Sequence, residues 1–161
     1  MATRIVHELT YEAPLADVAA MLADPAFRRE VCEYQRATKH SVSIDGVQGD
    51  PMKVRIEYSQ PTDRVPGFAK KFVGAETDIV QSETWTSPER GEIHVTIPGK
   101  PGDLTGTAVL TEKDGVTTET VTLDITVKIP LVAGKIEGLI GKIFGSAMRA
   151  ENRAGVAWLA R

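Results

Sequence analysis

The chain has 161 residues, of which 42% are apolar and 25% are charged, a composition typical of one globular domain and not of a disordered segment. Its formal net charge of −3 argues against nucleic-acid binding, because that function usually needs a basic surface. The one cysteine, Cys32, excludes an internal disulfide and indicates a reducing, cytoplasmic compartment, and no uncharged apolar run reaches the roughly 18 residues of a membrane span.

The first 36 residues predict a strand and two short helices. Residues Thr3–Tyr11 alternate, with Ile5, His7 and Leu9 on one face, which is the period of a half-buried strand. Pro14 and the pair Asp24-Pro25 are helix-start signals, and the apolar spacing after each predicts helices over about residues 15–22 and 25–36.

The middle of the chain has a period of two. Alternating apolar residues predict six more strands, at about residues 42–44, 52–58, 76–86, 92–98, 104–112 and 116–129. Short connections such as Asp114-Gly115 are typical of hairpins, so the sheet should be antiparallel. Because the alternation is one-sided, only one face of the sheet should cover a core.

Residues 131–160 return to helical spacing. The apolar side of this predicted helix carries Val132, Ile136, Leu139, Ile140, Ile143, Ala147, Ala154 and Trp158. A helix of about 30 residues is roughly 45 Å long, which is enough to cross a small sheet.

This order of elements resembles the helix-grip fold of the START and pollen-allergen (SRPBCC) superfamily. The segments Pro66-Gly67-Phe68-Ala69-Lys70-Lys71-Phe72 and Lys128-Ile129-Pro130-Leu131-Val132 are similar to a bacterial family of unknown function within that superfamily. The resemblance implies one α+β domain over residues 1–161, with a curved seven-stranded antiparallel sheet wrapped around a long C-terminal helix. It also implies a cavity between sheet and helix that holds an apolar molecule, and it transfers no cofactor and no catalytic residues.

The apolar faces predict which side chains line that cavity. They are Tyr58, Phe68, Phe72, Trp85, Leu110, Leu123, Ile136, Leu139 and Ile143. Residues 66–74 combine two phenylalanines with two lysines between glycines. This segment is either a mobile flap over the cavity mouth or a fixed plug at the edge of the core.

Catalytic and metal-binding signals are weak. The sequence has no nucleophile-elbow, dinucleotide-binding, phosphate-loop or zinc-protease motif, and His7, His40 and His94 lie on separate elements, so no metal site is predicted. If Glu83 points into the cavity, desolvation would raise its pKa and suit it to acid–base work. Alternatively, the opposite face with Val80 points inward and Glu83 is solvated. His7 is either a hydrogen-bonded core residue or a ligand contact.

The C-terminal helix carries two further stripes. Gly134, Gly138, Gly141 and Gly145 are predicted to lie roughly opposite its apolar face, beside a basic line of Lys135, Lys142, Arg149 and Arg153. The glycines would allow close approach of a partner helix, as in a homodimer, and the basic line would allow transient contact with an anionic membrane. The alternative is a solvated face without a partner.

Three functions remain open. The first is binding or carriage of a lipid, isoprenoid or polyketide-like molecule, without catalysis. The second is a cyclase or dehydratase-like enzyme that uses Glu83 or His7 as acid or base. The third is an interaction module that uses the glycine and basic face of the last helix. The absence of a strong catalytic constellation favours the first.

Overall fold

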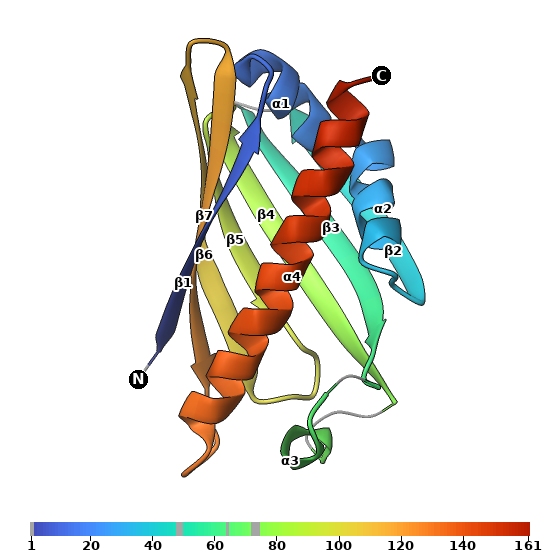
Figure 1. Ribbon diagram of the computed structural model, residues 1–161, viewed down its shortest axis with the longest axis vertical. Coiled ribbons are helices and arrows are strands. Elements are labelled where there is room, and N and C mark those ends of the chain that lie inside the picture. The colour runs from blue at the N-terminus through green and yellow to red at the C-terminus, as the bar shows by residue number, and fades with distance from the viewer. Residues whose placement is uncertain (1, 48–49, 64, 72–74) are drawn as a thin grey trace.

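The computed structural model describes residues 2–47, 50–63, 65–71 and 75–161 (Figure 1). It contains one seven-stranded sheet in the order β1-β7-β6-β5-β4-β3-β2, and all neighbouring strands are antiparallel. The strands are β1 (Thr3–Tyr11), β2 (Lys39–Val47), β3 (Asp50–Pro61), β4 (Glu76–Ser87), β5 (Arg90–Thr96), β6 (Gly102–Lys113) and β7 (Val116–Val127). The predicted seven-stranded antiparallel sheet is confirmed.

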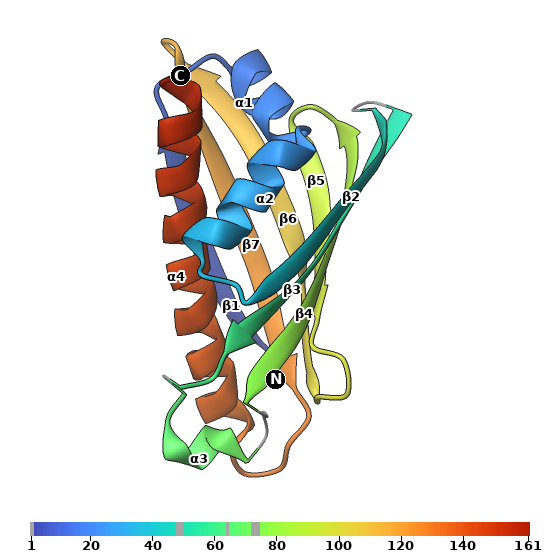
Figure 2. The same cartoon turned by 90° about the vertical axis from the view of Figure 1, so that its right-hand side faces the viewer.

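Four helices accompany the sheet in the described ranges. They are α1 (Leu15–Leu22), α2 (Pro25–Tyr34), α3 (Gly67–Lys70) and the long α4 (Ala133–Leu159). The curved sheet lies along α4, with α1 and α2 at one end of the molecule and α3 at the other (Figures 1 and 2). The predicted helix-grip arrangement is therefore confirmed.

The core lies between the sheet and the helices. Along β7 every second side chain is buried, from Thr117 to Val127, and the intervening ones are half-exposed. This alternation continues on its neighbour β6, where Leu104, Ala108 and Leu110 are buried. One face of the sheet is thus apolar and covered, as the period of two predicts.

The buried face of α4 is rotated from the predicted one. Gly141 and Gly145 are buried, whereas Ile143 is 40% exposed. A Cβ on Gly141 would lie 3.3 Å from Cγ2 of Ile5, and one on Gly145 would lie 3.2 Å from Cε1 of His7. The predicted placement of these two glycines opposite the buried face is therefore wrong, because their lack of side chains lets α4 approach β1. Around Gly134 and Gly138, by contrast, a Cβ would meet nothing within 4 Å.

The C-terminus of α2 has an unusual residue in its cap. Arg36 has a φ of 59°, and its N–H donates to the carbonyl of Glu33, while the N–H of Ala37 donates to the carbonyl of Cys32. These two bonds form a Schellman motif, whose left-handed position is usually a glycine. A non-glycine residue costs about 1–2 kcal/mol in that conformation.

Candidate functional site

A cavity of about 200 Å³ lies between the first half of α4 and the end of the sheet next to α3. Its wall is almost entirely apolar, with aliphatic side chains from β4, from β7 and its extension, and from α4, and the underside of α3 covers it. The lining residues include Val65, Ala69, Ile79, Ile97, Val127, Ile129, Ile136, Leu139, Ile140, Ile143 and Phe144. We call this space the apolar pocket.

A second, more polar space of about 510 Å³ adjoins the apolar pocket. The two share the lining residues Gln60, Ile79, Ile143 and Phe144, so they lie next to each other along one side of α4. The second space extends toward the C-terminus of α2, and its other lining residues are Tyr34, Gln35, Arg36, Tyr58, Lys142, Ser146, Ala147, Ala150 and Arg153. We call it the outer pocket.

The predicted lining residues fall in four places. Ile136, Leu139 and Ile143 line the apolar pocket, and Tyr58 lines the outer pocket. Leu123 borders only a void of about 10 Å³ farther along α4. Trp85 and Leu110 are buried in the core and line neither pocket, because the curvature of the sheet packs their part of it against α1, α2 and the end of α4.

The segment that the sequence singles out as a flap or plug contains α3. Ala69 is 3% exposed and faces the apolar pocket, while Phe68 is 48% exposed and does not line it. Phe72 and Gly74 lie outside the described residues. Phe68 therefore does not plug the core in this conformation, and the short helix covers the pocket with its backbone and Ala69.

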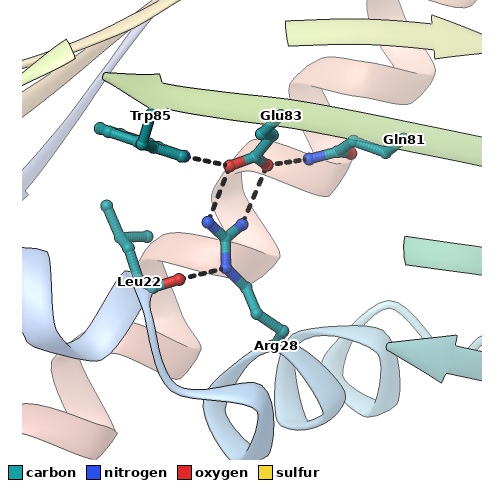
Figure 3. Close-up of polar contacts among 5 residues, drawn as sticks. All are labelled: Leu22, Arg28, Gln81, Glu83 and Trp85. Atoms are coloured by element: carbon teal, nitrogen blue, oxygen red, sulfur yellow. Dashed lines mark hydrogen bonds and ion pairs between the residues drawn. The ribbon is translucent and has the colours of Figure 1, made fainter. Parts of the chain in front are cut away.

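A buried ion pair lies near the opposite end of the molecule, between α2 and β4 (Figure 3). The Arg28 guanidinium donates to both carboxylate oxygens of Glu83, over 2.8 and 3.0 Å, and both side chains are 4% exposed. Its Nε donates to the carbonyl of Leu22, over 2.8 Å, which satisfies an acceptor at the C-terminus of α1. Arg28 thus joins α1, α2 and the sheet.

Two further donors fix the Glu83 carboxylate. Trp85 Nε1 donates to Oε1 over 2.8 Å, and Gln81 Nε2 donates to Oε2 over 2.6 Å (Figure 3). The Trp85 ring fits where it does because Gly91 on β5 has no side chain: a Cβ there would lie 2.5 Å from Cε2 of the ring. Both oxygens of Glu83 are therefore held by charged and neutral donors.

This geometry corrects both sequence-based expectations for Glu83. The side chain is buried and not solvated, so the expectation that Val80 points inward in its place is wrong. Burial alone would raise the pKa of Glu83, but the Arg28 charge and the hydrogen bonds from Arg28, Trp85 and Gln81 lower it below its ordinary value. A carboxylate held ionised and fully bonded in this way is not suited to be a general acid.

Two more carboxylates are buried beside this pair. Glu119 from β7 and Glu151 from α4 are 3% and 7% exposed, and they line the void of about 10 Å³ together with Glu83. Oε1 of Glu119 and the hydroxyl of Tyr11 have no hydrogen-bond partner among the described residues. Burial and the charge of Glu151 raise the pKa of Glu119, and burial raises that of Glu151 to about 7 despite the Arg28 charge. The void has room for about one water molecule, not for a substrate.

The remaining candidates lie apart from both pockets. His7 borders a groove between β1 and α4, on the other side of the helix. Cys32 is buried, and burial raises the pKa of its thiol to about 11, so it is a packed core residue and not a nucleophile. Within the described ranges, no three His, Cys, Asp or Glu side chains are grouped as a metal site, and no helix has the length and apolarity to span a membrane.

Arg28, Glu119 and Glu151 are absent from the sequence-based site, although the pattern holds a signal for each. Arg28 precedes Val31 and Cys32 by three and four residues, so it shares their buried helical face. Glu119 has the same parity as Val121 and Leu123 on β7, and Glu151 is three residues from Met148 and Ala154 on α4. A charged residue at a position whose spacing puts it on the apolar face of its helix or strand is thus the sequence signal for the buried polar cluster.

Comparisons with known proteins agree with this fold. The model of a family described as "Protein of unknown function (DUF2505)" matches residues 6–159. The uncharacterized protein Rv0481c of Mycobacterium tuberculosis is 28% identical over 131 residues, which cover 76% of this chain and 75% of that protein.

Two solved structures are similar to this chain over nearly its whole length. A START superfamily protein from Mycobacterium smegmatis has a TM-score of 0.60 at 12% identity, covering 94% of this chain and 96% of the other. Ara h 8.0201 has a TM-score of 0.65 at 9% identity, covering 98% and 99%. At these identities the likeness establishes a shared fold.

Proposed function

Because the chain belongs to the DUF2505 family and has the helix-grip fold of the START and pollen-allergen superfamily, we propose that it binds a hydrophobic small molecule as one domain. The observation that carries this proposal is the apolar pocket of about 200 Å³ under α4 and α3. Apolar cavities of a few hundred Å³ with a small number of polar groups at one end are typical ligand sites.

The geometry supports binding over acid–base catalysis. Neither Glu83 nor His7 lines the apolar or the outer pocket, so neither can reach a molecule held there. The void beside Glu83 is too small for a substrate. A direct test of the proposal is native mass spectrometry after mild purification, in which a bound lipid-like molecule would appear as an added mass. Release of that mass on denaturation, and its absence from a pocket-filled variant, would identify the pocket as its site.

Filling the apolar pocket should weaken binding. Leu139 lines the pocket and is half-buried, so L139W places an indole into the space of about 200 Å³. We expect at least a roughly tenfold rise in the Kd for the neutral fluorophore N-phenyl-1-naphthylamine, since a filled pocket leaves little apolar area for the probe to bury. Fluorescence titration measures this effect on protein freed of co-purified ligand.

The matched control for this experiment is V156W, on the same helix. Val156 is 53% exposed and lines neither pocket, so the same indole there should leave the Kd unchanged. Equal affinities of L139W and the wild type would contradict the proposed site.

The α3 segment should act on ligand entry more than on stability. Because Phe68 is 48% exposed, F68A should change the free energy of unfolding by no more than about 0.5 kcal/mol. We expect a change in the rate of probe uptake, measured by stopped-flow fluorescence, since α3 covers the apolar pocket. We also expect faster hydrogen exchange in residues 66–71 than in β7.

Val6 on β1 is also exposed, and V6A is the control. V6A should alter neither the free energy of unfolding nor the rate of probe uptake. A loss of several kcal/mol in F68A, as for a buried aromatic side chain, would instead identify the segment as a fixed plug.

A further inference from the structure

Three cationic side chains gather around the outer pocket. Arg36 follows α2, and Lys142 and Arg153 come from α4, where their spacing of about three turns puts them on one side of the helix. All three are exposed, and none of the described residues lining the pocket is acidic. No ion pair joins any of the three to a carboxylate within the described part of the chain.

This concentration of positive charge is local. The chain as a whole has a formal net charge of −3, so a pocket rim with three cations and no described acid departs from the average surface. Arg36 also holds its place in a left-handed conformation that a glycine would adopt with less strain. Arg36 thus places a positive side chain at a position where the backbone conformation favours glycine, which has no side chain.

The outer pocket lies next to the apolar one. Ile143 and Phe144 line both, and Lys142 immediately precedes them on α4. Hydrogen-bonding groups also face the outer pocket, including Tyr34, Ser146 and the amides of Gln35 and Gln60, which bond to each other over 3.3 Å. A molecule that lies in both spaces therefore meets a mainly aliphatic wall, which includes Lys100, at one end and three cations with polar donors at the other.

We propose that the ligand is an amphiphile whose anionic head group lies in the outer pocket among Arg36, Lys142 and Arg153, and whose apolar tail fills the apolar pocket. This inference rests on the proposed function and narrows its ligand class. A carboxylate and a phosphate share the required chemistry, since both accept hydrogen bonds from guanidinium and ammonium groups.

The test compares ligands with one tail and different heads. Decanoate, decyl phosphate and decanol are titrated by displacement of N-phenyl-1-naphthylamine, and inorganic phosphate is titrated by calorimetry. We expect each anionic amphiphile to bind about tenfold more tightly than decanol, which corresponds to several exposed charge contacts of modest strength. This preference should shrink in high salt, because exposed charges are screened. The ratio of decanoate to decyl phosphate affinity distinguishes a carboxylate from a phosphate head.

Charge removal provides the matched variants. R36Q/K142Q/R153Q should lose the preference for the anionic amphiphiles and keep the affinity for decanol. The control R29Q/K135Q/R149Q removes three exposed cations from α2 and α4 that do not line the outer pocket, and it should keep the preference.

The outcomes separate the two proposals. Equal binding of decanol and both anionic amphiphiles would overturn the anionic-head inference and leave the hydrophobic pocket standing. Failure of all three amphiphiles to bind would overturn both. Inorganic phosphate that binds as tightly as decyl phosphate would also overturn the inference, because the tail would then contribute nothing.

Discussion

The variant R28M is expected to lower the free energy of unfolding by about 3–5 kcal/mol, because it leaves a buried carboxylate without its cation. Glu83 is 4% exposed and receives two hydrogen bonds from the guanidinium that the variant lacks. The carbonyl of Leu22 loses its donor as well. Urea denaturation followed by circular dichroism measures the change.

Two further variants show whether the loss comes from the unpaired charge. In R28M/E83Q the carboxylate is absent, and the amide oxygen can still accept from Trp85, so most of the stability should return. Arg4 and Asp124 make the same two-bond contact, over 2.8 and 3.0 Å, on the surface. R4M should therefore have a far smaller effect than R28M, since water solvates the remaining carboxylate. Similar losses in R4M and R28M would contradict the role given to the buried pair.

The free energy of unfolding should fall as the pH rises from about 4.5 to above 7. Burial holds the pKa of Glu151 at about 7 and that of Glu119 above its ordinary value of 4.5, so the folded protein retains protons that the unfolded chain releases in this window. For Glu151 alone the loss amounts to about 3 kcal/mol. Glu83 has a lowered pKa, so its contribution is lost only at lower pH, as the pH falls through that pKa.

The variants E119Q and E151Q should each be more stable than the wild type at pH 8, and the pH dependence should flatten. The charged and titratable groups around them are Arg28 from α2, Glu83 from β4, Tyr11 from β1 and Tyr58 from β3, and none of these is altered. The matched control is E137Q, also on α4. The Glu137 carboxylate accepts hydrogen bonds from the Thr3 hydroxyl and the Val127 N–H, and its pKa is lowered. E137Q should therefore be less stable than the wild type at pH 8. A wild type with constant stability between pH 5 and 8 would contradict this account.

The strands themselves follow from the sequence because each carries its own alternating pattern, and their antiparallel direction follows from the short connections. The pairing of β1 with β7 does not follow from these patterns. The side of α4 that faces the sheet does not follow in the same way. Hydrophobicity alone places Ile143 toward the core, whereas the absence of side chains at Gly141 and Gly145 turns that part of the helix toward β1. Close approach of two backbones depends on the partner surface, which a one-dimensional pattern does not contain.

The candidate pocket is predictable to a similar degree. The residues of the first half of α4 that line it are in the sequence-based set, since they lie on one apolar stripe. Trp85 and Leu110 share the apolar face of the sheet but lie where helices fill the space above it. Which part of an apolar face borders a void depends on sheet curvature and helix placement. The protonation state of the buried Glu83 likewise depends on its pairing with Arg28, which lies 55 residues away in the chain.

The pairing of β1 with β7 affects the order in which the chain can fold. Thr3 pairs with Ile125 and Tyr11 with Thr117, so β1 leaves the ribosome long before its neighbour β7. The hairpins from β2 to β7 join strands that are adjacent in the chain, and all of them close short loops except the β3–β4 connection, which contains α3. Contacts of long sequence separation form slowly, because the entropy of a large loop is lost before they are made. During synthesis, β1 therefore remains without its partner strand β7 until late, and the part of the apolar face that α4 covers stays exposed until α4 has emerged.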